Sequence, residues 1–201
     1  MNAFGAFEGF ATPAPVMVDV YTSAYRISGT VHTPFKRVAE ILNQLPGGHL
    51  TVERATISEH GADGATIASP SALVATDEIL AMLATDLPVE SRGEMRIQKR
   101  LVRAQLAIPP LRLTGTIHVP MGSRPVDGLL NVPDRFMPMT DVAITCAAFP
   151  HLERSAAIIA LRRDRAHVLL VADDERPDEL LADVLDERTA ESWLRPGEER
   201  G

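Results

Sequence analysis

Cysteine, aromatic residues and long apolar runs are all scarce in this chain of 201 residues, and each scarcity excludes some classes of protein or site. The single cysteine, Cys146, cannot form a disulfide within the chain and has no metal framework around it, which favours a reducing compartment. Aromatic residues make up only 4%, so the core must be aliphatic. No apolar run approaches the ~20 residues of a membrane-spanning helix, and the residues before Glu8 include no basic leader. We therefore expect a cytoplasmic protein without a membrane partner.

Basic residues are in the minority as well. The chain has 20 Lys and Arg against 27 Asp and Glu, a formal net charge of −7 and a pI near 5.4. Binding through nucleic-acid phosphates needs clustered positive charge, so this balance argues against nucleic acid as the main partner. With 45% hydrophobic and 23% charged residues, the composition is that of an ordinary folded protein, which excludes wholesale disorder.

One stretch of ten residues occurs twice, at 25–34 and 111–120. Arg, Gly, Thr, His and Pro recur in the same order, and the positions that differ keep their chemical character. Such duplication at roughly half the chain length predicts two tandem units of about 70 to 80 residues each. Units of this size have small cores, so we expect them to share an interface and to unfold together.

The periodicity of the chain predicts a mainly β protein with minor α. Alternation before and within each repeated stretch is typical of strands, whereas residues 35–43 place Val38, Ile41 and Leu42 at helical spacing. We expect two homologous small β-barrels of Sm-like or SH3-like form, each with one short helix, and a C-terminal helix. The predicted segments are a flexible arm over 1–15, a first β repeat over 16–84, a connector over 85–101, a second β repeat over 102–173 and an acidic helix and tail over 174–201.

The repeated residues resemble an uncharacterised bacterial family of small β domains. Its members carry Tyr-Arg-Ile-x-Gly-x-(Ile/Leu)-His-x-Pro and then Arg-x-x-(Asp/Glu)-x-Leu-Asn. The chain has this pattern at 25–34 with Arg37, Glu40, Leu42 and Asn43, and at 111–120 with Arg124, Asp127, Leu130 and Asn131. The second copy departs from it by Leu111 in place of Tyr and by one extra residue after Arg124. The resemblance covers most of 16–171 and implies no established activity, and a more distant similarity to Sm-like small barrels concerns the fold alone.

The candidate structural or binding positions are those that both copies share: Arg26, Gly29, His32, Asn43, Arg112, Gly115, His118 and Asn131. A glycine within a strand indicates a bulge or sharp bend, where φ can be positive. The paired histidines could hold a metal or act as acid and base, but isolated histidines more often tie a strand to a neighbouring loop, and we favour that role.

The other repeated polar residues also have structural interpretations. We expect the two arginines to face solvent or to pair with Glu40 and Asp127. Each asparagine follows a leucine at a helix end, where asparagine accepts the left-handed conformation that ends helices.

No catalytic motif accompanies the repeat. The sequence contains no nucleophile elbow and no phosphate-binding loop, so we predict neither an enzyme nor a bound cofactor. The favoured function is that of a non-catalytic protein-interaction or scaffold protein, with another protein as its partner. The alternative is a small-ligand or nucleic-acid binding module that uses the groove between the repeats. The sequence leaves the oligomeric state open.

Overall fold

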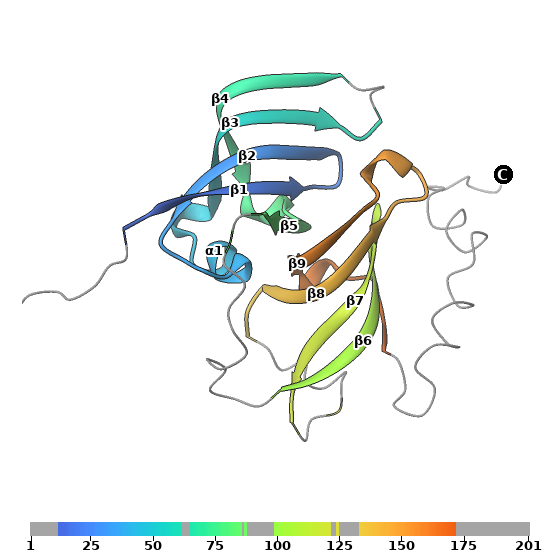
Figure 1. The fold of residues 1–201 in the computed structure, drawn as a ribbon. Coiled ribbons are helices and arrows are strands. Elements are labelled where there is room, and N and C mark those ends of the chain that lie inside the picture. Colours follow the sequence, from blue (N-terminus) through green and yellow to red (C-terminus); the bar gives the residue numbers. More distant parts are fainter. Residues whose placement is uncertain are drawn as a thin grey trace, which may run out of the picture.

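A computed structural model shows one open antiparallel sheet of ten strands and very little helix (Figure 1). It describes residues 12–61, 65–85, 87, 99–121, 124 and 133–171. The strands are β1 Ala14–Tyr21, β2 Tyr25–Thr33, β3 His49–Glu59, β4 Thr66–Ala75, β5 Ala81–Ala84, β6 Lys99–Ile108, β7 Leu111–Pro120, β8 Phe136–Thr145, β9 Arg154–Arg162 and β10 Val168–Val171. The α-helix is α1 Val38–Asn43, and the short 3-10 turns are η1 Pro46–Gly48, η2 Thr76–Glu78, η4 Pro150–Leu152 and η5 Arg163–Arg165.

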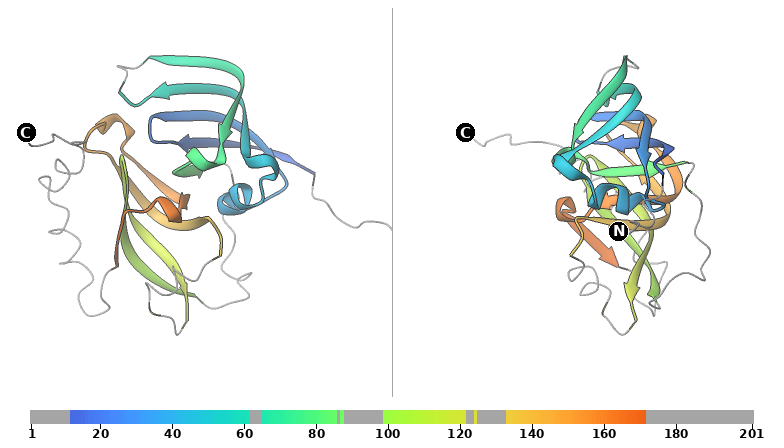
Figure 2. Two further views of the ribbon diagram at one scale, coloured as in Figure 1. Left: turned by 180° about the vertical axis from the view of Figure 1, so that it is seen from behind. Right: turned by 90° about the vertical axis from the view of Figure 1, so that its left-hand side faces the viewer.

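The same pairing pattern occurs on both sides of the middle of the sheet, whose strand order is β10-β6-β7-β8-β9-β5-β1-β2-β3-β4. Strands β1 to β4 form a meander, and β5 returns to pair with β1. Strands β6 to β9 form a second meander, and β10 returns to pair with β6. We call β1–β5 the first unit and β6–β10 the second unit. The two units meet where β5 pairs with β9, and Figure 2 shows them on either side of this contact.

The predicted mainly β class is confirmed, whereas the pairing shows one open sheet where we expected two closed barrels. In the described chain β5 pairs with β1 and β9, not with β4, so the first unit does not close on itself through backbone hydrogen bonds. The helix expected over 35–43 is confirmed as α1, with Val38, Ile41 and Leu42 buried. Strand β1 begins at Ala14 and β6 at Lys99, within the ranges predicted as arm and connector, most of whose residues lie outside the described part. The second short helix and the C-terminal helix lie outside the described residues.

Each repeated glycine lies opposite a bulge. The register between β2 and β3 shifts between Ser28 and Thr30, and the register between β7 and β8 shifts between Thr114 and Thr116. In both places two residues of one strand oppose a single glycine of the other. The left-handed conformation belongs to the bulged strands, where Arg54 has φ 49° and Asp141 has φ 51°.

The expected bend is therefore present, and it does not require a positive φ at either glycine. Both glycines are needed because the backbones approach closely. A Cβ on Gly29 would stand 2.6 Å from the carbonyl oxygen of Glu53, and a Cβ on Gly115 would stand 2.8 Å from that of Thr140. A side chain at either position would push the bulge apart.

Substitution of either glycine by alanine should therefore destabilise the fold. We expect Gly29→Ala and Gly115→Ala each to lower the free energy of unfolding by about 1–3 kcal/mol, as overpacking does elsewhere. Urea denaturation followed by circular dichroism measures the change. Gly61→Ala is the matched control, since the nearest atom to its Cβ would be 3.9 Å away on Phe149. Unchanged midpoints for both bulge variants would contradict this account.

Candidate functional site

The contact between the units is a short stretch of antiparallel pairing in the interior. Ala81, Met82 and Leu83 of β5 face Leu161, Ala160 and Ile159 of β9. The Arg162 N–H donates to the Leu80 carbonyl oxygen at 2.8 Å and extends this pairing by one residue. The paired side chains are all buried, so the hydrogen bonds of this junction are shielded from water.

The junction also joins the two hydrophobic cores. The first core is built mainly from the first unit but includes Phe136 and Ala160 of the second. The second core is built mainly from the second unit but includes Tyr21, Leu80 and Leu83 of the first. Neither core is complete without side chains from the other unit.

Asn43 holds the end of α1 to the second unit. Its side-chain Nδ2 donates to the Phe136 carbonyl oxygen at 2.8 Å, and its Oδ1 accepts from the Phe136 N–H at 2.9 Å. The interpretation of Asn43 as a left-handed helix end is wrong, because Gln44 is the C-cap and Asn43 is not among the residues with positive φ. The amide instead continues the backbone hydrogen bonding of β8 beyond its first residue.

An ionic cluster at Asp19 ties β1 to the second unit. The carboxylate accepts from Arg26 at 3.0 Å and from the Ser28 hydroxyl on β2, and it is paired with Arg154 on β9. Burial by itself would raise the pKa of Asp19, but Ser28 and the two guanidinium groups outweigh burial and hold the pKa below the ordinary value of 3.8. The carboxylate is therefore ionised wherever the protein is folded near neutral pH.

A second polar cluster surrounds Arg162, whose side chain is buried. The guanidinium binds Asp164 through two hydrogen bonds, of 2.8 and 3.0 Å. It also donates to the carbonyl oxygens of Thr76 and Asp77 in η2 of the first unit. Asp77 is paired in addition with Arg135 of the second unit. The turn that leads into β5 is thus held by cations from the other unit.

A buried histidine lies elsewhere along the same contact. His60 follows β3, and its Nε2 is 3.1 Å from the Thr22 carbonyl oxygen. Its ring lies against Phe149 of the second unit, with ring centroids 5.7 Å apart. Burial lowers the pKa of His60, so the neutral ring is the favoured form.

The repeated histidines and arginines do not converge on one site. His32 is exposed on β2 and lies 3.3 Å from Glu53, whereas His118 is half-buried on β7 and contacts the Thr140 hydroxyl at 3.0 Å. Four strands of the sheet separate β2 from β7, so the two histidines cannot share one metal ion. Among the residues that the structure describes, no three histidine, cysteine or carboxylate side chains are grouped for metal binding.

Arg26 has a partner other than the one expected, whereas the expected partner of Arg112, Asp127, lies outside the described residues. Arg26 pairs with Asp19, and Glu40 pairs instead with Arg37 at 3.3 Å. Arg112 lies half-buried on β7. The prediction for Asn131 falls outside the described residues.

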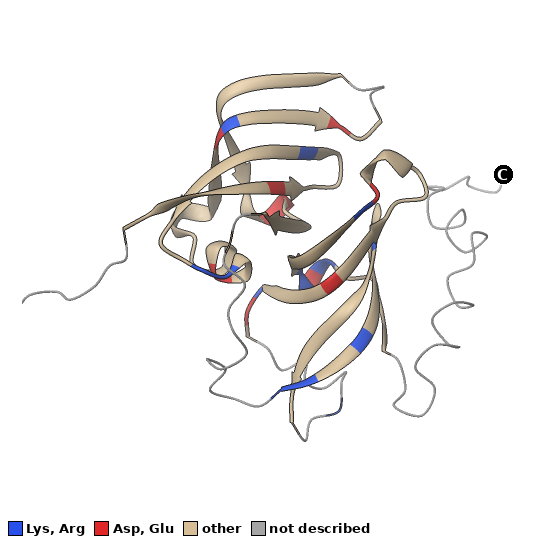
Figure 3. Ribbon diagram, viewed as in Figure 1, with Lys and Arg blue, Asp and Glu red and all other residues tan. Residues whose placement is uncertain are grey.

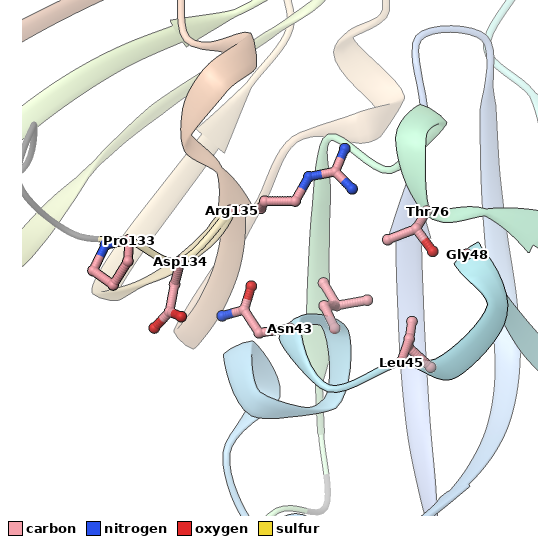
Figure 4. A pocket seen from close by; sticks show the side chains of 8 residues that line it. Asn43, Leu45, Gly48, Thr76, Pro133, Asp134 and Arg135 are labelled. Carbon is pink, nitrogen blue, oxygen red and sulfur yellow. The ribbon is translucent and has the colours of Figure 1, made fainter.

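One small cavity opens at the junction, on the side of α1 (Figure 4). It measures about 230 Å³, and its walls come from both units: Leu42, Asn43, Leu45, Gly48, Thr76, Pro133, Asp134 and Arg135. Two of its polar side chains have partners outside the cavity, since Asn43 is bonded to Phe136 and Arg135 is paired with Asp77, whereas the buried Thr76 hydroxyl has no hydrogen-bond partner. Cavities that hold small molecules usually measure about 300–1,000 Å³, so this one is below that range.

The two edges of the sheet have an unusual composition. Both β4, with ten residues, and β10, with four, lack charged residues, and Figure 3 shows β4 without charge along its whole length. Leu73 and Ile67 on β4 are 70% and 67% exposed. Natural edge strands usually carry charges that block pairing with another chain, and Pro70 is the one residue of this protective kind on β4. These edges are the surfaces best suited to binding another strand.

Of the polar residues at the junction, Asn43 was a candidate from the sequence, but Asp19 and Arg154 were not; the differences between the two copies could have indicated them. Counted from the repeated glycines, Asp19 corresponds to Gln105. Counted from the bulges, Arg154 corresponds to Ile67. Asn43 is shared by both copies, whereas Asp19 and Arg154, which also build the contact between the units, occur in one copy only.

No protein-family model, curated protein or solved structure matches this chain. Within the described residues, no helix has the length and apolar character needed to cross a membrane. The family resemblance and the function accordingly remain predictions.

Acid should weaken the fold through Asp19. Because the pKa of Asp19 is lowered in the folded state, its stabilisation is present above about pH 4 and is lost as the pH falls through the folded value. We expect Asp19→Asn to cost about 1–3 kcal/mol of unfolding free energy at neutral pH, and the gap to wild type to narrow in acid. Chemical denaturation at several pH values measures both effects, with the exposed Asp134→Asn as control. A gap that does not depend on pH would refute the role given to this carboxylate.

Loss of the Asn43 amide should weaken the whole molecule and not one unit. We expect Asn43→Ala to lower the unfolding free energy by about 1–3 kcal/mol, because two hydrogen bonds to the Phe136 backbone are lost. Calorimetry should still show one transition, since the cores are shared. The exposed neighbour Gln44→Ala should have little effect. Two separate transitions in the wild type or the variant would show that the units fold independently.

Proposed function

We propose that this chain is a non-catalytic protein-interaction or scaffold protein, made of two tandem five-stranded units of small-barrel type. The observation that carries the proposal is the bare edge at β4. An uncharged strand of ten residues with two exposed large apolar side chains, Leu73 and Ile67, is a template for another strand. A protein that had only to remain monomeric would gain from a charge there.

The mode of binding that this edge supports is strand addition. In that mode a partner segment forms backbone hydrogen bonds with the edge, and pockets for alternate side chains provide specificity. The chain itself contains an example, because β5 adds to the outer side of β9 and buries the whole of that contact. The second unit's fourth strand is thus covered, whereas the first unit's fourth strand is open.

Ligand binding in the groove between the units is the weaker alternative. The cavity at the junction has about 230 Å³, and two of its polar side chains are bonded elsewhere, Asn43 to Phe136 and Arg135 to Asp77. Nucleic acid is disfavoured by the net charge of −7 and by the scarcity of aromatic residues for base stacking.

Site-specific photo-crosslinking tests the proposal directly. A benzophenone amino acid in place of Leu73 should form covalent adducts with protein in the cell of origin, because that side chain lies on the proposed docking edge. The same group in place of Leu101 is the control, since Leu101 is 56% exposed but lies on β6, outside the pairing with β10.

Adducts that form at position 73 and not at position 101 would support an interaction edge. Equal labelling at both positions, or no adduct with any protein at position 73, would contradict the proposed function.

A further inference from the structure

We propose that the strand that binds β4 is β10 of a second copy of this chain, so that copies associate head to tail. This inference rests on the proposed function and adds the identity of the partner. Within the part of the chain that the structure describes, β4 and β10 are the two edge strands of the sheet. Strand β4 is the fourth strand of the first unit, and β10 is the fifth strand of the second unit. Inside the chain a fourth strand, β9, likewise pairs with a fifth strand, β5.

The positions on β4 and β9 correspond residue by residue. Leu73 pairs with Thr51, which is three residues before the bulge residue Arg54. Ala160 pairs with Pro138, which is three residues before the bulge residue Asp141. Leu73 of β4 therefore occupies the place that Ala160 occupies on β9, at the centre of the internal junction.

The positions on β10 and β5 correspond in the same way. Val18, the partner of Gly29, pairs with Ala84 at the end of β5. Ala104, the partner of Gly115, pairs with Val171 at the end of β10. It follows that Val168, Leu169 and Leu170 stand where Ala81, Met82 and Leu83 stand in the internal junction.

Burial differs sharply between these equivalent positions. Ala160 is completely buried in the internal junction, whereas Leu73 is 70% exposed. Leu83 is buried on β5, whereas Leu170 on β10 is only partly buried. If β10 of a second copy paired with β4 in the register that β5 and β9 use, Leu170 would lie opposite Ala72 and Leu169 opposite Leu73. Apolar side chains would thus cover apolar side chains along the whole new contact.

The turns beside the two edges have complementary charge. In the internal junction the Asp77 carbonyl oxygen of η2 accepts a hydrogen bond of 3.3 Å from Arg165 of η5. In the proposed contact, η5 of one copy approaches η2 of the next. The sequence of η5 is Arg-Asp-Arg and that of η2 is Thr-Asp-Glu, so a basic turn meets an acidic turn. A pairing of β4 with β4 would lack this contact, because an antiparallel pair of β4 strands places the two η2 turns at opposite ends.

Such a contact is heterologous, because each copy contributes a different edge and keeps its other edge free. Repetition of the contact gives a ring if the rotation closes and a helical filament if it does not. In either case the assembly grows beyond a dimer from one kind of junction.

The test measures the mass of the full-length protein by sedimentation and native mass spectrometry over a dilution series. It compares the wild type with two variants in which a charge blocks one edge strand. Leu73→Asp places a charge in the middle of β4, and Leu170→Asp places one on β10, at a side chain outside both hydrophobic cores. Each variant should weaken self-association by roughly hundredfold or more, since the carboxylate would be buried without a partner. Leu101→Asp, an equal change at an exposed site of β6, should associate as the wild type does.

Mixing the two blocked variants gives the sharpest result. Each retains one competent edge, so together they should form a one-to-one heterodimer that neither forms alone. Circular dichroism and melting confirm that each variant folds before it is mixed.

A wild-type protein that stays monomeric at every concentration overturns the proposal. So does a dimer that survives in either variant alone, because that dimer would use a different surface. If position 73 crosslinks to another protein while the chain is monomeric, the interaction edge stands and self-assembly does not.

Discussion

The placement of β5 between β1 and β9 is the constraint on which the rest of the structure depends. This strand of four residues belongs to the first unit by sequence, yet its backbone completes the sheet of both units. Because β5 is buried, removing it from either side would leave backbone groups without partners in an apolar interior, which costs free energy for each group. The exchange of core residues follows from this placement, since Leu83 and Tyr21 lie in the second core while Phe136 and Ala160 lie in the first. Two small units, each with a core of limited size, are stabilised as one body.

The polar residues around this contact distinguish the internal junction from the proposed contact between copies. Inside the chain, Asp19 and Arg154 add an ion pair to the apolar pairing of β5 with β9. At the free edges the equivalent residues are Gln105 and Ile67, so the proposed contact between copies would rest on apolar burial and on the charges of the flanking turns. The added ion pair should make the internal contact more stable than the proposed contact between copies. The same strand-to-strand geometry would then serve folding within the chain and assembly between chains.

The repeat and the period of the strands were enough to predict the β class, the bends at Gly29 and Gly115, and helix α1. Local sequence could not predict that β5 would pair across the junction instead of closing a barrel, because that choice depends on packing between residues distant in the chain. Asn43 shows the same limit. Its place after a leucine at a helix end suggested a cap, but its amide is used 93 positions away, at Phe136. The ion pair at the junction could not be predicted from the shared residues, because the two copies do not share Asp19 and Arg154.

Native-state hydrogen exchange at the Arg162 amide tests the central claim most directly, because that N–H donates across the junction to Leu80. If the junction is part of one cooperative core, this amide should exchange only through global unfolding, with the same free energy of opening as the most protected amides of β2 and β7. Denaturant should lower that free energy with the slope of complete unfolding. An Arg162 amide that exchanges through a much smaller opening, while β2 and β7 stay protected, would show that the units separate without unfolding and would contradict the account.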